Sequence, residues 1–371
     1  MRIAIGVDLH KATSSAYAVY AGEGKENDRH RRFLDGFNGE FGKFPSTPEN
    51  FERLSAFVRG HECFVLLENS TKAHEVYWVL RNIGMNVTVA HSTDLYRITK
   101  SVKKTDRNDS IELAGYMRRR LGGEVEFSEC FIPSQEWMVR REMCRVVSSE
   151  RAYLADTKRR IRAHMLLHGI KLKREYDDIT CGKATVELCR FKDPHLAVLM
   201  RSAAEVKKRI DMGERMIEHL FAGNRMFDLI YSVVGIGVVT SAYLAALIVD
   251  IGRFSSCNNF TASFGVVPKK RSSGENDPNC ATTHRGDDLA RELLKQCAMV
   301  HVNNVPDSVV TKLYRRLVAK GKPKRVALIA ASRSLLTVVW SVLKSGKEYT
   351  SDPETLKMTR KMAEGELTAG E

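Results

Sequence analysis

Two carboxylates, Asp106 and Asp109, lie three residues apart in the stretch KKTDRNDS, which is otherwise rich in positive charge. In a helix, side chains three positions apart share a face, so these carboxylates repel each other unless a cation lies between them. A divalent cation is one explanation. The other is an ordinary helix start, because Asp is favoured as an N-cap and in the first turn, with Thr105 or Asp106 as the cap. The spacing alone favours the helix start, so other carboxylates must decide.

Two more carboxylates end apolar runs in the N-terminal third. Asp8 ends the run RIAIGVD, which is followed by a second predicted strand, SSAYAVY, and Glu68 ends the run CFVLLE. Between them, we predict a third strand with loops within residues 21–50 and a helix from Thr47, its N-cap. A helix closed by Gly84 and a strand, MNVTVAH, follow.

This order of elements, ββ(β)αβαβα, places Asp8 and Glu68 at the carboxyl ends of central strands, where open α/β sheets carry their sites. We expect the helix of Asp106 and Asp109 to join them from the edge of the sheet. Four such carboxylates suit a pair of Mg²⁺ ions, which prefer oxygen ligands. Two ions about 4 Å apart stabilise both the attacking and the leaving oxygen of a phosphoryl displacement. The sequence therefore predicts a Mg²⁺ site.

Composition points to a nucleic-acid partner. The 371 residues are 43% hydrophobic, enough for two or three folded domains, and Lys and Arg exceed Asp and Glu by 59 to 45, a net charge of +14. We find no run of about 18 apolar residues for a membrane span, and the start, MRIAIGVDLHK, is charged too early for a signal peptide. We therefore expect a cytoplasmic protein without a membrane partner. The eight cysteines form no CxxC pair, which argues against zinc and disulfides.

The middle of the chain reads as a basic helical hairpin. Residues 138–174 have apolar residues at helical spacing and carry far more Lys and Arg than acids. A polar link, 177–192, leads to a second amphipathic helix, 193–223, predicted to pack antiparallel on the first. The basic face either contacts nucleic acid or is the solvated face of a coiled coil. The candidate contacts are Arg140, Arg141, Arg145, Lys158, Arg159, Arg160 and Arg162.

Two glycines, Gly235 and Gly237, flank an isoleucine before a helix of small residues. The pattern resembles a helix-hairpin-helix, whose turn brings backbone N–H groups to a phosphate. The alternative is a tight helix–helix turn that needs glycine for packing. Ser241, within the following helix, reads as a packing residue.

A better serine lies in the stretch VPKKRSSGENDPNCATTHRGDD. Ser272 and Ser273 precede Gly274, and a hydroxyl among cations can attack a phosphate whose charge those cations offset. On its own the stretch is an ordinary polar loop. The flanking cations are Lys269, Lys270, Arg271 and Arg285. No GxxxxGK[ST] loop is present, so we expect chemistry without ATP.

Four stretches, GVDLHK, VLLEN, KTDRNDSIELA and RSSG, occur in the order found in the DEDD transposases of the insertion-sequence one-ten family (IS110), the bridge-RNA-guided recombinases, which the chain resembles over nearly its whole length. Two loops depart from the family pattern: ENSTKAH replaces a Thr-Gly, and AHS replaces an Asn-Pro. Neither change touches a candidate metal ligand.

The resemblance implies a fold and a division into domains. It implies an RNase H-like (RuvC-like) mixed-sheet α/β domain at 1–125, a basic helical coiled-coil insertion at 126–222, a mostly helical transposase domain at 223–346 and a loose polar tail at 347–371. It makes Asp8, Glu68, Asp106 and Asp109 the catalytic metal ligands and Ser273 the nucleophile, with Ser272 left open.

The function implied is DNA recombination guided by a bridge RNA on donor and target DNA. A dimer assembling to a tetramer would act in the bacterial cytoplasm, at the nucleoid, and would join one subunit's carboxylates to another's serine. Two alternatives remain at this point. One is a RuvC-like nuclease or Holliday-junction resolvase that uses water, and the other is a non-catalytic nucleic-acid scaffold.

Overall fold

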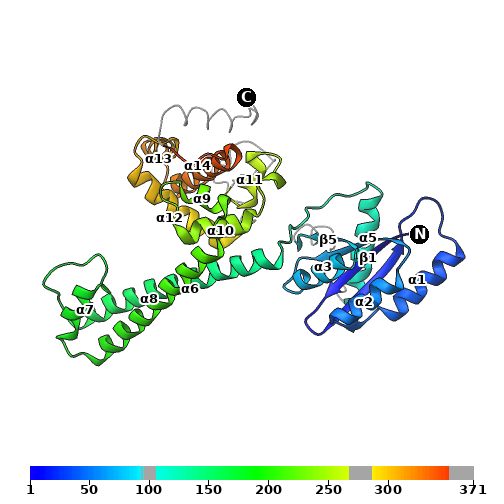
Figure 1. The fold of residues 1–371 in the computed structure, drawn as a ribbon, viewed down its shortest axis with the longest axis horizontal. Helices are drawn as coiled ribbons and strands as arrows, with labels where there is room; N and C mark the ends of the chain where they lie inside the picture. The colour runs from blue at the N-terminus through cyan, green and yellow to red at the C-terminus, as the bar shows by residue number, and fades with distance from the viewer. Residues whose placement is uncertain (93–94, 96–105, 267–285, 351–371) are drawn as a thin grey trace. The chain divides into compact units, whose positions relative to one another are not determined.

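The computed structural model describes residues 1–92, 95, 106–266 and 286–350 of the chain. The chain divides into two compact units between Ser134 and Gln135. The first unit is a mixed α/β domain and the second is helical. Each is described by itself below, with element labels as in Figure 1.

The first unit is built on a five-stranded sheet in the order β3-β2-β1-β4-β5. β1, β4 and β5 are parallel neighbours, while β2 is antiparallel to both β1 and β3. The predicted strands that end near Asp8 and Glu68 are confirmed. The strands are β1 (Arg2–Leu9), β2 (Thr13–Tyr20), β3 (Phe44–Pro45), β4 (Glu62–Glu68) and β5 (Asn86–Ala90).

The prediction for residues 21–50 is wrong in its main feature. Most of this stretch forms helix α1 (Asp28–Glu40), and the third strand is only Phe44–Pro45. Asn27 caps the helix by accepting the backbone N–H of His30 at 2.9 Å. Leu34 and Phe37, three residues apart, bury the same helix face. The charged and glycine-rich sequence around this short apolar stripe concealed the helix.

Helices cover both faces of the sheet. α1, α2 (Pro48–Phe57) and α3 (Ala73–Asn82) pack on the face that carries Ile3, Ile5 and Val7. Helix α5 (Asp106–Leu121) packs on the other face, against Ala4 and Leu66. Side chains alternate along a strand, so β1 contributes Ala4, Gly6 and Asp8 to the face covered by α5.

Helix α5 lies on the face of the sheet, across β1, β2 and β4, and not at its edge as predicted. Gly6 makes this possible. A Cβ atom at Gly6 would lie 2.2 Å from the backbone nitrogen of Ala114 and 2.3 Å from the carbonyl oxygen of Ser110. Only glycine lets the backbone of α5 approach the centre of the sheet so closely.

The second unit begins with a helical hairpin, as predicted. α6 (Gln135–Leu167) and α8 (Pro194–Leu220) run antiparallel, because the partners on α8 have falling residue numbers along α6: Arg140 bonds Leu220, Glu150 bonds Arg209 and Tyr153 bonds Ser202. The polar link between them contains a further helix, α7 (Gly182–Cys189), that the sequence did not reveal. We call residues 150–214, the distal part of this hairpin, the arm.

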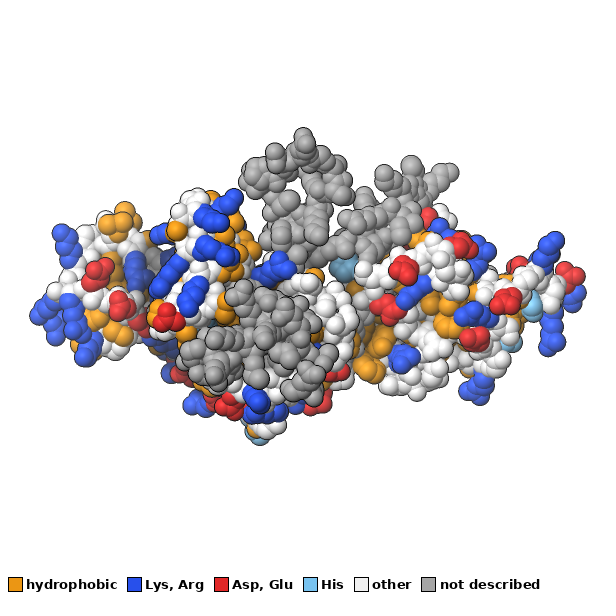
Figure 2. All heavy atoms as spheres, turned by 90° about the horizontal axis from the view of Figure 1, so that it is seen from above, with side chains coloured by type: hydrophobic (Ala, Val, Ile, Leu, Met, Phe, Trp, Pro, Cys, Tyr) orange, Lys and Arg blue, Asp and Glu red, His pale blue; other side chains and the backbone are white. Residues whose placement is uncertain are grey.

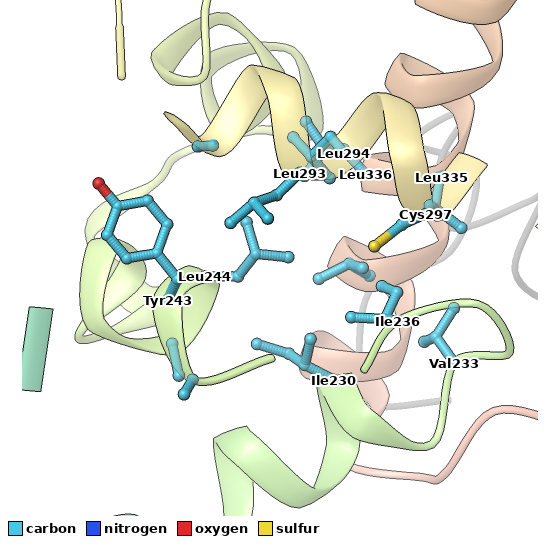
Figure 3. Packing of buried hydrophobic residues seen from close by; sticks show 14 of the residues in the cluster. Ile230, Val233, Ile236, Tyr243, Leu244, Leu293, Leu294, Cys297, Leu335 and Leu336 are labelled. Carbon is cyan, nitrogen blue, oxygen red and sulfur yellow. The ribbon is translucent and has the colours of Figure 1, made fainter. Parts of the chain in front are cut away.

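The rest of the second unit is a helical core around α10 and α14 (Figures 1 and 3), into which the first half of α6 also packs through Cys144 and Val147. α14 is long and apolar enough to cross a membrane, contrary to the sequence prediction, but 61% of its apolar window is buried here. A core helix of a soluble domain passes the same test. The helices are α9 (Arg225–Tyr231), α10 (Val238–Ile248), η1 (Ile251–Arg253), α11 (Cys257–Ser263), α12 (Asp288–Asn304), α13 (Val309–Ala319) and α14 (Lys324–Ser345).

Candidate active site

Asp8 lies one residue before the end of β1 and is only 9% exposed. It follows Gly6 on the same side of the strand, so it belongs to the face that α5 covers. Its Oδ2 lies 3.1 Å from Nε2 of His10. Across the sheet its register partner on β2 is Ser15, which is buried. A carboxylate so placed is held by its strand and not by a flexible loop.

Glu68 is the last residue of β4, the parallel neighbour of β1. Val7 pairs with Leu67, so Asp8 and Glu68 occupy the next step of the same register. Leu66, two residues earlier, packs beneath α5, and alternation therefore assigns Glu68 to that face as well. Glu68 itself is exposed. Two carboxylates thus lie on one face, at one end of two adjacent strands.

The first turn of α5 brings the third carboxylate. Asp109 directly precedes Ser110, whose carbonyl oxygen lies against Gly6, two residues from Asp8. Ser110 is buried and its hydroxyl donates to the carbonyl of Arg107 at 2.9 Å. Asp106 is the first residue of α5, and its side chain lies outside the described part of the structure.

The donors at this end of the sheet suit a hard cation. Asp8, Glu68 and Asp109 offer only carboxylate oxygens, which Mg²⁺ prefers, and their backbones are fixed by the sheet and by the packing of α5 on Gly6. Within the described residues, however, no three acidic, His or Cys side chains converge closely enough to hold a metal ion. The structure gathers the carboxylates on one face without completing a ligand set among the described side chains.

The predicted serine and its neighbours lie outside the described residues. These are Lys269, Lys270, Arg271, Ser272, Ser273 and Arg285.

The two ends of segment 267–285 are described, and they lie together. Val266, before the segment, is buried in the helical core. Gly286, after it, has φ +123° and packs so tightly that a Cβ would lie 2.7 Å from the carbonyl oxygen of Ser263 and 3.0 Å from the nitrogen of Gly265.

The glycine pair serves packing at one position and leaves space at the other. Gly235 has φ +94°, and a Cβ there would lie 2.8 Å from the carbonyl oxygen of Cys297 on α12. Gly237 is the N-cap of α10, with nothing within 4 Å of its Cβ position. Ser241 is buried and donates to the carbonyl of Gly237, so its packing role is confirmed.

The basic residues in the first half of α6 are bonded within the helical unit. Arg140 donates to the carbonyl of Leu220 and stacks on Trp137. Arg141 donates to the carbonyl of Ala246 near the end of α10, and its burial lowers the pKa of its guanidinium. Arg145 forms an ion pair with Asp287. These contacts bind the hairpin to the core.

The basic residues of the arm differ among themselves. Arg159 and Arg160 are 74% and 63% exposed and pair only with Asp156, one turn away. Arg162 donates to the carbonyl of Asp177.

The sequence placed Lys158 on the same solvated face, which is wrong. Lys158 and Lys207 both bind Asp178, at 3.0 and 2.9 Å, and this contact anchors the segment before α7. Sequence reasoning missed Asp178 and Asp287. Asp287 had a signal, because an acid directly before an apolar-periodic helix is a typical N-cap.

Comparison with known proteins bears on the helical unit first. Residues 228–315, which run from α9 into α13 and include the predicted serine, match the sequence model of a family described as Transposase IS116/IS110/IS902 family.

Longer similarities extend over most of the chain. The transposase for insertion sequence element IS1328 of Yersinia enterocolitica is 24% identical over 248 residues, 66% of this chain and 72% of that protein. The transposase for insertion sequence element IS1111A of Coxiella burnetii is 22% identical over 295 residues, 77% of this chain and 79% of that protein. The protein y4qE of Sinorhizobium fredii, which carries a transposase name, is 22% identical over 307 residues, 76% of each chain. The helical unit thus contains a segment similar to the IS116/IS110/IS902 family of transposases, and most of the chain is similar to transposases of insertion sequences.

Proposed function

We propose that this protein is the transposase of an insertion sequence, which cuts and rejoins DNA strands by phosphoryl transfer. The observation that carries the proposal is the placement of Asp8 and Glu68 at the same end of adjacent parallel strands, on the face where the first turn of α5 adds Asp109. The sheet order is compatible with an RNase H-like (RuvC-like) domain. The family match of the helical unit supports the DNA-processing role.

We infer that Asp8, Glu68, Asp106 and Asp109 hold Mg²⁺. When bound, the ions would offset the charge that develops on the phosphate oxygens during displacement. The chain's own contribution is to fix these carboxylates before DNA arrives. β1 and β4 set the spacing of Asp8 and Glu68, and the close contact of α5 with Gly6 sets the height of Asp109 above them.

Ser273 is the proposed nucleophile. Its hydroxyl loses a proton, its Oγ bonds to the phosphorus, and the bond from phosphorus to the departing DNA oxygen breaks. The phosphoserine ester keeps the bond energy, so a free DNA hydroxyl can later attack it and release the serine without ATP. The cations Lys269, Lys270, Arg271 and Arg285 would offset the phosphate charge nearby.

The proposed partners are donor and target DNA and a guide (bridge) RNA. The net charge of +14 favours polyanions, and the arm offers exposed cations such as Arg159 and Arg160. In Figure 2, Lys and Arg side chains on the visible face of the arm are mixed with hydrophobic ones. If base pairing reads the DNA sequence, no protein recognition helix is needed. The place of action would be the bacterial cytoplasm, at the nucleoid.

We also propose that the protein works as a homo-oligomer, a dimer that assembles to a tetramer. Val139, Val146 and Tyr153 recur every seven residues along α6, and each is about half exposed. Leu167, two further heptads on, is 79% exposed. Apolar side chains at heptad spacing are typical of a helix that pairs with another helix.

A RuvC-like nuclease or Holliday-junction resolvase that uses water is the second candidate. The same three described carboxylates support it, and Ser273 would then have no chemical role. A non-catalytic scaffold is a third candidate, favoured only by the glycine turn at 235–237.

Cleavage of supercoiled donor DNA with Mg²⁺ separates the three. We expect Asp8→Ala and Ser273→Ala each to lower the cleavage rate by about 1,000-fold or more. Glu62→Ala, an exposed acid at the opposite end of β4, is the matched control and should cleave normally. Normal cleavage by Ser273→Ala would support the water-using nuclease. Normal cleavage by Asp8→Ala would rule out the carboxylate site in both enzymes. Sequencing of RNA that copurifies with the protein tests the guide.

A further inference from the structure

One ion pair joins helix α6 to the end of the segment that contains Ser273. Arg145 on α6 binds Oδ2 of Asp287, although the two residues are 142 positions apart. Asp287 comes two residues after the segment 267–285. Its side chain is only 17% exposed, whereas that of Arg145 is 43% exposed. The pair is therefore shielded on the side of the acid.

Asp287 has little freedom in the core. Its other oxygen, Oδ1, accepts the backbone N–H of Ala290 at 2.9 Å and so caps α12. The preceding residue, Gly286, is wedged against the backbone of Ser263 and Phe264. One carboxylate thus links α6 to α12 at the point where the segment returns to the core.

The surroundings of this ion pair are tightly packed as well. The guanidinium of Arg145 lies 5.6 Å from the ring centre of Tyr243, a fully buried residue of α10. Figure 3 shows the hydroxyl of Tyr243 pointing away from the leucines of the core. Burial, and then the nearby Asp287 carboxylate, raise the pKa of this hydroxyl, so it remains neutral beside the ion pair. One turn before Arg145 on α6, Arg141 donates to the carbonyl of Ala246 on α10.

Beyond Arg145, α6 continues without interruption into the arm. Glu150 accepts two hydrogen bonds from Arg209, and Arg151 bonds Glu214. Gly213 of α8 allows Val147 to approach closely. Helix α6, 33 residues long, is therefore one continuous element that contains Arg145 and the first contacts to the arm.

We propose that Arg145 is a positioning residue for the reaction, which acts through Asp287 to hold the serine-containing segment at its root. The inference rests on the proposed role of Ser273. It gives α6 a second task besides joining the arm to the core: the helix that extends into the arm also fixes the place from which the nucleophile must reach DNA. Displacement of a reacting group by about 1 Å can lower a rate about 100-fold.

The test is single-turnover cleavage of supercoiled DNA by Arg145→Met and by Asp287→Asn. Asn keeps the N-cap of α12 but removes the charge that Arg145 binds. We expect each variant to lower the cleavage rate about 10- to 100-fold at saturating DNA, with DNA affinity changed by less than about threefold. The double variant should be no slower than either single one, because both remove the same contact. Arg145→Lys, which keeps the charge, should recover much of the rate.

Arg151→Met is the matched control. It removes an ion pair of similar exposure from the same helix, but that pair leads to α8 and not to the serine segment. We expect normal cleavage from it. Equal slowing by Arg151→Met and Arg145→Met would show that the hairpin's general rigidity matters and would overturn the positioning role. So would normal cleavage by Arg145→Met in a preparation where Ser273→Ala is inactive. Full activity of Ser273→Ala would instead overturn the serine assignment itself.

Discussion

The two units of the chain bring distant residues together by different means. In the α/β unit, Asp8 and Glu68 become neighbours because β1 and β4 pair in a parallel register, which backbone hydrogen bonds define. In the helical unit, Arg145 and Asp287 meet only because side chains of α6, α10 and α12 pack in one arrangement. Sites set by strand register can be anticipated from a sequence, whereas sites set by helix packing leave no local pattern.

The comparison also predicts where each unit is most vulnerable. The α/β site depends on one missing Cβ, at Gly6, below α5. The helical unit depends on a similar contact at Gly235 and on a set of ion pairs. The following variants are ordered from the largest expected effect to the smallest.

Gly6→Ala should have the largest effect. The new methyl group would meet backbone atoms of Ser110 and Ala114 near 2.2 Å, and backbone atoms cannot turn away as a side chain can. We expect a loss of about 3 kcal/mol in the free energy of unfolding and loss of cleavage. Denaturant unfolding measures the first and the DNA assay the second. Gly115→Ala, with open space on the same helix, should instead stabilise by about 0.5–1 kcal/mol. A Gly6→Ala protein of normal stability would show that α5 does not depend on this contact.

Gly235→Ala should destabilise the helical unit by about 2 kcal/mol, because a left-handed backbone and a crowded Cβ act together. Gly237→Ala should leave the stability nearly unchanged, because its Cβ position is open. Thermal unfolding of both variants gives the comparison. DNA affinity then separates the two interpretations of the turn: reduced affinity in a stable Gly237→Ala protein would favour the helix-hairpin-helix, and unchanged affinity would favour a packing turn.

Asp178→Asn tests an ion-pair network in the arm. Burial alone would raise the pKa of Asp178, but hydrogen bonds from Thr180, Lys207 and Lys158 outweigh it and lower the pKa well below its usual 3.8. A lowered pKa in the folded state means that the ion pairs stabilise the protein above the unfolded value and that this stability is lost as the pH falls below it. The site is partly exposed, so solvent screening limits the effect to about 1 kcal/mol at pH 7.

The measurement is thermal unfolding of wild type and Asp178→Asn between pH 7 and pH 3. The difference between the two proteins should shrink as the pH falls through the acid range. Asp177→Asn, at the exposed neighbouring position, is the control and should follow wild type. A difference that stays constant with pH would mean that packing, and not the charge of Asp178, stabilises this segment.

The smallest effect is expected from Arg159→Glu with Arg160→Glu. These side chains are exposed and pair only along their own helix, so the fold should be unaffected. If both contact RNA phosphates, the slope of log binding constant against log salt should decrease by about 1.4–1.8 units. Lys158→Glu is the contrast, because it should lower the stability of the arm through Asp178. An unchanged slope in the double variant would return these residues to a solvated coiled-coil face.

The parts of the fold that the sequence predicted well share a strong periodic signal. The strands ending near Asp8 and Glu68, the helix closed by Gly84 and the α6–α8 hairpin were all anticipated, because burial imposes a regular apolar pattern on each. Helices α1 and α7 were missed, since each buries only a few residues within a polar sequence. The position of α5 on the sheet face was mispredicted, because a single glycine of β1 permits it.

The sequence by itself determined the residue types and their order: two carboxylates ending apolar strands, a third and fourth in one helix turn, a basic hairpin and a serine among cations. These follow from local pattern, which short-range physics sets. Only the tertiary structure decided that α5 lies across Gly6 and that Lys158 serves Asp178. It alone joined Arg145 to Asp287 across 142 residues. The physical reason is that such contacts depend on which surfaces pack together, and packing is a property of the whole chain.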